Sequence, residues 1–252
     1  MSLVLQDLTR RFGRATAVDR VSMAVEFGEM VAVIGRSGAG KSTLLNMINR
    51  LIEPTSGHIF ANGRDISRLR GRELRAWRRE TAMVFQRFNL VQRLSVLTNV
   101  MTGRLNHPPV LPKSLGIFLE ADRIAAIEAL AMLDLDTHAL KRADELSGGQ
   151  QQRVAIARAL VQQPRIILAD EPVASLDPLN SQAVMEALRD INAERGITVI
   201  CNLHSVALTR QYCRRVIGIA RGRIVFDGPV DQLDDAALLR IYESHTALEE
   251  AT

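Results

Sequence analysis

The sequence predicts an α/β protein with a parallel sheet at its core, a small antiparallel β layer and an inserted helical subdomain. An apolar run at 30–34 leads into the glycine-rich stretch GRSGAGKST (35–43), which a helical pattern follows. Farther along, RIILAD (165–170), a long helical pattern and ITVICNLH (197–204) repeat the strand–helix–strand order. Because that alternation is typical of parallel sheets, we expect one large α/β domain over residues 1–247.

The composition indicates a globular protein. Of its 252 residues, 47% are hydrophobic and 24% are charged, which is enough to bury a substantial core. No stretch approaches the roughly 18 apolar residues of a membrane-spanning helix, and the N-terminal segment reaches charge too early for a secretory signal. We therefore expect a soluble, cytoplasmic protein. Cys201 and Cys213 are too few for a disulfide framework and lack metal-ligand spacing, which predicts reduced, partly buried thiols.

Strand and turn patterns fill the N-terminal part of the chain. The segments 2–13 and 17–35 alternate as strands separated by turns. SGHIFANGRDIS (56–67) adds short strands around an Asn-Gly turn at Asn62 and Gly63. These segments predict the antiparallel layer beside the parallel core.

A helical pattern runs from Leu97 to Leu140 and is broken by the proline-rich segment 106–116. Within it, EADRIAAIEALAML (120–133) has the period of an amphipathic helix. We therefore place an inserted helical subdomain at roughly 90–162.

Seven arginines and only two acids lie in GRDISRLRGRELRAWRR (63–79), on a predicted amphipathic helix and its approach. The whole chain carries a formal net charge of +4. The cluster fits a solvated helix face. It fits equally a surface that contacts an anionic membrane or a membrane partner. A nucleic-acid patch is disfavoured because no aromatic residue except Trp77 is interleaved with the arginines. No nucleic-acid partner is expected.

The stretch 35–43 matches the phosphate-binding pattern GxxxxGK[ST]. Its glycines let the backbone wrap around phosphates, Lys41 reaches the β- and γ-phosphates, and the hydroxyl of Ser42 ligates Mg²⁺. The pattern has a strand before it and a helix after it, so we expect a bound nucleoside triphosphate. The expected phosphate-binding residues of this loop are Gly35, Arg36, Ser37, Gly38, Ala39, Gly40, Lys41, Ser42 and Thr43.

A second candidate anion site occurs in LSGGQQQRVAIARAL (146–160), where Ser147, Gly148 and Gly149 open a helical run. The first N–H groups of a helix have no partner within the helix and lie at the positive end of its dipole. This entry is therefore also predicted to hold phosphate.

Two adjacent acids, Asp170 and Glu171, follow the apolar strand pattern of RIILAD. An acid at the end of a buried strand can hold Mg²⁺, and the next carboxylate is placed to orient or deprotonate an attacking water. Taken alone, the two acids fit a simple turn equally well. Together with Lys41 they favour triphosphate hydrolysis.

The order and spacing of GRSGAGKST, LSGGQ, ILADEP, SLDP and the lone LH resemble the ATP-binding subunits of ABC transporters over nearly the whole chain. The resemblance implies a P-loop NTPase core with the ABC signature in the helical subdomain. It also implies ATP and Mg²⁺ as cofactors and a homodimer packed head to tail. Each ATP would lie between the glycine-rich loop of one subunit and the Ser147, Gly148, Gly149 and Gln150 signature of the other.

The same resemblance assigns roles to three further residues. Gln86 would sense Mg²⁺ and water and would link the core to the helical subdomain, although a surface polar residue also fits its position. His204 would contact the γ-phosphate, whereas a lone histidine elsewhere is usually structural. Asp177 would link the two ATP sites across the dimer and could cap a helix at the same time.

Two positions depart from the family pattern. Phe12 stands where a tyrosine usually stacks on adenine; its ring keeps the stacking face, and packing in the core is the alternative. Ser205 replaces the aspartate that often follows the histidine, so the contact which that aspartate makes is in doubt.

A chain of this kind implies separate permease subunits in the membrane, reached by a periplasmic substrate-binding protein, and a peripheral location at the cytoplasmic face of the inner membrane. The stretches 143–178, GRIVFDGP (222–229) and LLRIY (238–242) resemble the subgroup that imports phosphonates. Importers of phosphate, polar amino acids or methionine are the nearer alternatives. A soluble ABC ATPase acting on nucleic acid is the more distant one.

Overall fold

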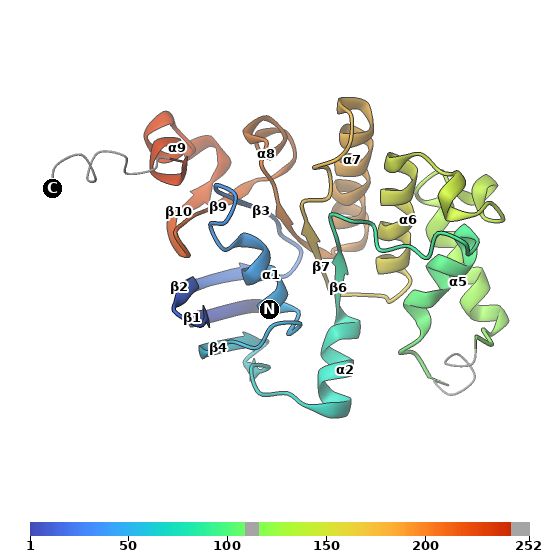
Figure 1. Ribbon diagram of the computed structural model, residues 1–252, viewed down its shortest axis with the longest axis horizontal. Helices are drawn as coiled ribbons and strands as arrows, with labels where there is room; N and C mark the ends of the chain where they lie inside the picture. Colours follow the sequence, from blue (N-terminus) through green and yellow to red (C-terminus); the bar gives the residue numbers. More distant parts are fainter. Residues whose placement is uncertain (109–115, 243–252) are drawn as a thin grey trace, which may run out of the picture.

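The computed structural model describes residues 1–108 and 116–242 and contains two β-sheets (Figure 1). The four-stranded sheet has the order β2 (Ala15–Glu26), β1 (Ser2–Phe12), β4 (Ser56–Ala61) and β5 (Arg64–Asp65), and its strands are antiparallel. The six-stranded sheet has the order β10 (Arg223–Pro229), β9 (Arg215–Ala220), β3 (Met30–Ile34), β8 (Thr198–Asn202), β7 (Ile166–Asp170) and β6 (Thr81–Val84).

The strands from β9 to β6 are parallel, and only β10 pairs antiparallel at the edge. The helices are α1 (Lys41–Ile48), α2 (Gly71–Glu80), α3 (Val96–Met101), α5 (Glu120–Ala131), α6 (Gly148–Leu160), α7 (Pro178–Arg195), α8 (Val206–Tyr212) and α9 (Asp235–Tyr242). Short 3₁₀ turns lie at η1 (Thr102–Arg104), η2 (Asp136–His138), η3 (Ala143–Glu145) and η4 (Val230–Gln232). This arrangement confirms the predicted α/β class with a parallel core, an antiparallel layer and inserted helices.

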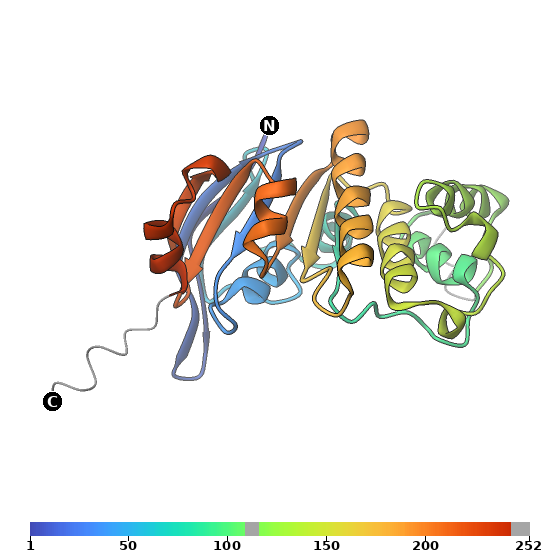
Figure 2. The same ribbon diagram turned by 90° about the horizontal axis from the view of Figure 1, so that it is seen from above.

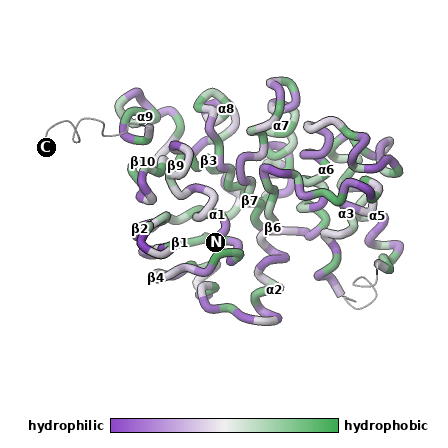
Figure 3. Tube along the Cα trace, in the orientation of Figure 1, coloured by the Kyte–Doolittle hydropathy of each residue, from purple (hydrophilic) through white to green (hydrophobic). Residues whose placement is uncertain are grey.

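The parallel strands are buried on both faces, because alternate side chains point to opposite sides of a sheet. In β3, Ala32 and Ile34 join a core that extends through α6 and α7, whereas Val31 and Val33 join a second core with α1 and the antiparallel sheet. Figure 3 shows these central strands mostly in the green of hydrophobic residues. Two cores therefore hold the sheet between helices and the antiparallel layer.

Helices α3, α5 and α6 pack against one another. Figures 1 and 2 show α5 and α6 at one end of the molecule, with β10 and α9 at the other. The boundaries of this helical subdomain, roughly 90–162, remain a prediction from the sequence. Part of the proline-rich segment 106–116, and the end of the predicted domain at 247, lie outside the described residues.

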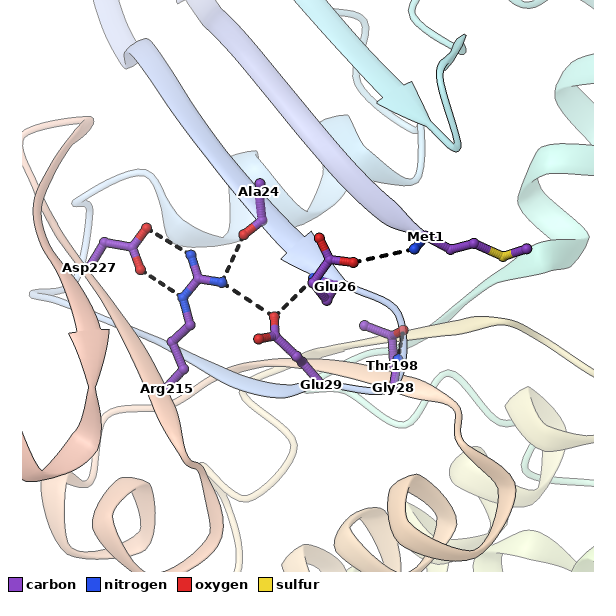
Figure 4. A network of polar contacts seen from close by, with 8 residues as sticks. All are labelled: Met1, Ala24, Glu26, Gly28, Glu29, Thr198, Arg215 and Asp227. Atoms are coloured by element: carbon purple, nitrogen blue, oxygen red, sulfur yellow. Dashed lines mark hydrogen bonds and ion pairs between the residues drawn. The ribbon is translucent and has the colours of Figure 1, made fainter.

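A polar network anchors the antiparallel sheet to the parallel one (Figure 4). The guanidinium of Arg215, on β9, donates to both carboxylate oxygens of Asp227 on β10, at 2.8 and 2.9 Å. It also donates to the carbonyl of Ala24 on β2 at 2.8 Å and lies 3.3 Å from the carboxylate of Glu29. One side chain thus joins three strands and the turn before β3.

Both cysteines are free thiols, as predicted, but they are buried and not partly buried: Cys201 is 0% and Cys213 3% exposed. Cys201 lies on the fully buried strand β8, and Cys213 follows α8. Burial raises the pKa of the Cys213 thiol to about 12 and raises that of Cys201 well above its usual value. Within residues 1–108 and 116–242, no helix has the length and apolar character needed to cross a membrane.

Candidate functional site

The glycine-rich loop joins the end of β3 to the start of α1. Gly35, Gly38 and Gly40 have φ values of 152°, 78° and 104°, a region that other residues rarely adopt. A Cβ atom on Gly35 would collide with the carbonyl of Ile219, and one on Gly40 with that of Ala17. The loop can therefore take this path only with glycine at 35 and 40, and a side chain at position 38 would strain the backbone.

The other loop residues divide between surface and interior. Arg36 and Ser37 are exposed, Ala39 is buried, and Ser42 and Thr43 are half-buried in the first turn of α1. The amide N–H of Ala39 donates to the Arg36 carbonyl at 3.1 Å, which closes the loop on itself. The predicted phosphate cradle is thus one continuous structure from Gly35 to Thr43.

Lys41 lies inside this loop with 4% of its surface exposed. Its ammonium donates to the carbonyls of Gly35 at 2.8 Å and Arg36 at 2.9 Å. Burial lowers the pKa of Lys41, and the negative charges of Glu171 and Asp170 oppose that shift. An ammonium has three N–H donors, so one remains for an anion in the loop.

The carboxylate of Asp170, at the end of β7, accepts a hydrogen bond from the hydroxyl of Ser42 at 2.8 Å. Asn202, paired with Asp170 in the register of β7 and β8, donates to the same oxygen at 2.7 Å and to Ser42 Oγ at 3.3 Å. Asn202 is fully buried, and its Oδ1 atom has no hydrogen-bond partner among the described residues.

Sequence reasoning missed Asn202. The available signal was an amide at the end of the otherwise apolar strand TVICN, directly before the segment that carries His204. Its contacts show that the two predicted metal ligands share a third, neutral neighbour.

A hydroxyl and one carboxylate, 2.8 Å apart beside a phosphate loop, fit Mg²⁺. Mg²⁺ usually takes one or two protein carboxylates and fills its other positions with phosphate oxygens and water. No group of three or more His, Cys, Asp or Glu side chains within the described parts of the chain could hold a metal on its own. The donor set therefore fits an ion that is shared with a nucleotide.

Glu171 and His204 meet at the same edge of the sheet. His204 Nε2 lies 2.6 Å from a carboxylate oxygen of Glu171. Glu171 has a φ of 51°, and its N–H donates to the carbonyl of Asn202 at 3.2 Å. The Glu171 side chain is 19% exposed and that of His204 is 42% exposed, so both can meet a ligand at the surface of the site.

Gln86 is exposed and follows β6, at the carboxyl end of the sheet with Asp170. The segment just after it is held by the helical part of the chain. Arg158, on α6, donates to the carbonyls of Phe88 at 2.8 Å and Asn89 at 2.5 Å. Gln86 therefore lies between strand β6 and a segment that helix α6 holds through Arg158.

Ser147 caps its own helix, α6. Its hydroxyl accepts from the N–H of Gln150 at 3.3 Å, and the Gln150 side chain accepts from the N–H of Ser147 at 3.0 Å. Ser147 and Gly148 are exposed, whereas Gly149 is buried. Figures 1 and 2 both show α6 well separated from α1, so one chain does not bring this segment to its own phosphate loop.

Asp177 caps α7, as the structural alternative predicted, by accepting from the N–H of Asn180 at 3.0 Å. Hydrogen bonds from Asn180 hold the pKa of Asp177 below its usual value. A Cβ atom on Gly149 would overlap the Asn180 side chain. The starts of α6 and α7 are therefore fitted to each other, with Gly149 against Asn180, the residue that Asp177 caps.

Phe12 is 46% exposed, so the alternative that it packs in the core is wrong. The guanidinium of Arg10 lies over its ring, 4.4 Å from the centroid. Ser205 caps α8 by accepting from the N–H of Leu208 at 3.2 Å. The serine therefore has a local role in ending the turn after His204.

Comparison with known proteins places these residues in a family. The family model described as ABC transporter matches residues 18–174. The chain belongs to the ABC transporter family, and its fold is that of the ATP-binding cassette. Over 247 residues it is 58% identical to the phosphonates import ATP-binding protein PhnC of Rhizobium meliloti (strain 1021), covering 98% of this chain and 88% of that protein.

Two solved structures support the same family. A dimeric ATP-binding cassette in a post-hydrolysis state with ADP and Pi is 34% identical, with a TM-score of 0.79 over 90% of this chain and 98% of that one. The ADP conformation of another ABC transporter cassette is 27% identical, with a TM-score of 0.85 over 96% of this chain and 98% of that one. Cassettes of this fold therefore bind adenine nucleotides and form dimers.

Proposed function

We propose that this chain hydrolyses ATP, with Mg²⁺, to drive the import of phosphonates through separate permease subunits. The observation that carries the substrate assignment is 58% identity, over 98% of the chain, to a protein named for phosphonate import. The gathering of Lys41, Asp170, Glu171 and His204 at one edge of the sheet supports hydrolysis.

The phosphates of ATP are held by the loop 35–43. Its glycines have positive φ values, which let the backbone wrap around phosphates, and the start of α1 adds the positive end of a helix dipole. Lys41 is already directed into the loop by two carbonyls and presents its remaining N–H to the β- and γ-phosphates.

Ser42 and Asp170 would hold Mg²⁺, together with Gln86, which follows β6 at the same end of the sheet. The ion neutralises phosphate charge when it is bound. Glu171 orients the attacking water and accepts its proton, because it follows Asp170 and its negative charge acts on Lys41 in the phosphate loop. His204, 2.6 Å from Glu171, fixes the direction of that carboxylate and contacts the γ-phosphate.

The working form is a head-to-tail homodimer. Ser147, Gly148, Gly149 and Gln150 complete the ATP site of the partner subunit, and Asp177 lies at the contact between the two sites. This arrangement explains why the exposed Ser147 and Gly148 lie far from the phosphate loop of their own chain. Phe12 stacks on the adenine through its exposed ring.

Coupling to transport runs through the residues after Gln86. Because Arg158 holds Phe88 and Asn89, a shift of Gln86 on ATP binding moves α6 with it. Docked permease subunits, fed by a periplasmic binding protein, convert that movement into a change of access. The chain therefore works peripherally, at the cytoplasmic face of the inner membrane.

Reconstitution with its permease and a periplasmic-type binding protein tests this proposal. ATP turnover should rise when an alkylphosphonate is added and should rise less with amino acids. Stimulation by methionine or a polar amino acid, with none by any phosphonate, would overturn the substrate assignment and leave the transport ATPase assignment intact.

A further inference from the structure

Six of the seven arginines of 63–79 divide into two groups in the folded chain; the seventh, Arg68, is exposed and precedes α2. Three of them have partners within the protein. Arg64 forms an ion pair with Glu73 at 2.6 Å, and Arg70 forms one with Glu53 at 2.5 Å. Arg78 donates a hydrogen bond to the Arg50 carbonyl at 2.5 Å. The arginines at 72, 75 and 79 form no hydrogen bond or ion pair with the described residues. Contacts within the described parts of the chain therefore do not explain why three arginines stand at positions 72, 75 and 79.

Arg72, Arg75 and Arg79 lie on one side of α2, because residues three and four apart share a helix face. The row extends over about 10 Å, at a rise of roughly 1.5 Å per residue. The opposite side of α2 is fixed in the core by Trp77, whose indole N–H donates to the Ile48 carbonyl at 2.9 Å. The three guanidinium groups therefore project from a rigidly held helix.

These arginines line a groove of about 720 Å³ together with Ala76, Asn106 and Pro108. None of these lining residues is acidic. Glu73 is paired with Arg64, and Glu80 lines a neighbouring hollow with Arg79 and Arg165. Three positive charges thus share a groove in which the described lining residues supply no countercharge.

We propose that this groove binds a phosphate-class oxyanion that carries an apolar group. A guanidinium presents paired N–H donors that match phosphate and phosphonate oxygens, and a doubly charged tetrahedral anion can accept from two arginines at once. Ala76 and Pro108 give the groove an apolar part for the organic substituent. An organic phosphonate, an organic phosphate and a phospholipid headgroup share this chemistry.

The groove is separate from the nucleotide site. Helix α2 precedes β6 and Gln86 follows it, so the two lie at opposite ends of the same strand. Figure 1 shows α2 below β6, and Figure 3 shows much of α2 in hydrophilic purple. The inference therefore does not depend on the proposed transport function.

The test uses the full chain saturated with ADP, at low ionic strength. Ethylphosphonate and inorganic phosphate are titrated by calorimetry, and vesicles containing phosphatidylglycerol are tested by co-sedimentation against neutral phosphatidylcholine vesicles. The variant R72Q/R75Q/R79Q is compared with R14Q/R93Q/R123Q, which removes the same charge from exposed arginines outside the groove. Trp77 emission, from the one tryptophan of the chain, checks that α2 stays folded in both variants.

We expect ethylphosphonate or the anionic vesicles to bind the wild type and the control variant alike. R72Q/R75Q/R79Q should bind at least about tenfold more weakly than the wild type. Added salt should weaken the binding of the wild type, because it screens the arginine charges. Binding of the free anion identifies a soluble ligand, and binding of vesicles alone identifies a headgroup. Equal binding to both variants, or no binding of any probe, would overturn the proposal. Retention of single-stranded RNA by these arginines, with no response to the oxyanions, would also overturn it in favour of nucleic acid.

Discussion

His204 Nε2 lies 2.6 Å from a carboxylate oxygen of Glu171, although the two residues are 33 positions apart in the chain. Each follows the end of a parallel strand, β7 for Glu171 and β8 for His204, and these strands are neighbours in the sheet. The pair brings a proton acceptor and an imidazole to the edge that also carries Asp170 and Ser42.

Glu171→Gln should bind ATP at near wild-type affinity and hydrolyse it at least on the order of a hundredfold more slowly, because the proposed general base is lost. Lys41→Ala should lose most ATP binding as well, since its ammonium is the charge inside the phosphate loop. Equilibrium ATP binding and single-turnover hydrolysis distinguish the two variants. Near wild-type hydrolysis by Glu171→Gln, with none by Asp170→Asn, would show that the water-orienting acid has been assigned to the wrong residue.

Asn202→Leu should raise the Mg²⁺ concentration needed for ATP-dependent stabilisation by about 10-fold or more, as expected for the loss of a group that positions the proposed metal ligands Ser42 and Asp170. The leucine keeps the size of the amide but cannot donate to Asp170 and Ser42. Thermal shifts with MgATP, titrated in Mg²⁺, measure this effect without turnover. Cys201→Ala, the neighbouring buried position on β8, is the control and should lower stability with no change in Mg²⁺ dependence.

The phosphate loop and its strand could be predicted because the signals are local. A glycine pattern, an apolar strand before it and a helix after it fix the position of Lys41 and Ser42 within one short segment. The acids after β7 were found in the same way. The parallel sheet itself followed from alternating strand and helix patterns.

Asn202 could not be found this way, because its importance arises from the pairing of β7 with β8. The sequence pattern does not show which strands are neighbours in the sheet, so the contact between Asn202 and Asp170 becomes visible only in the folded structure. The division of the arginines is similar: Glu73 and Glu53 neutralise Arg64 and Arg70, which are 9 and 17 positions away and are brought into contact by the fold. Burial of Cys213 was likewise underestimated, since it depends on packing after α8.

Arg215→Met should lower the free energy of unfolding by about 2 kcal/mol, because three hydrogen-bonded acceptors lose their shared donor. The side chain is 26% exposed, so water compensates for part of the loss. Arg189→Met is the matched control: its ion pair with Asp190 is on the surface and should contribute less than about 1 kcal/mol. Urea unfolding of both variants measures the difference, and equal midpoints would contradict a structural role for the Arg215 network.

Phe12→Ala should weaken ATP binding by about 1–3 kcal/mol, the usual contribution of a base stacked on an aromatic ring. Phe12→Tyr should leave the affinity unchanged because the ring is kept. Tripolyphosphate, which has no base, should bind all three proteins equally. If Phe12→Ala weakens tripolyphosphate as much as ATP, the ring supports the loop and does not contact adenine.

Ser147→Arg should abolish hydrolysis while each chain still binds ATP through its own loop 35–43. The exposed Ser147 lies at the start of α6, so a long cationic side chain there would obstruct the phosphates of the partner's ATP without entering the core. Sizing of Glu171→Gln with ATP and Mg²⁺ should show a dimer, and adding Ser147→Arg should return it to monomers. Ser147→Ala is the control for the loss of the helix cap. It removes the hydroxyl that accepts from the Gln150 N–H, which should cost about 1 kcal/mol of stability. Because alanine adds no bulk at the interface, the dimer should persist. A dimer that survives Ser147→Arg would count against the head-to-tail arrangement.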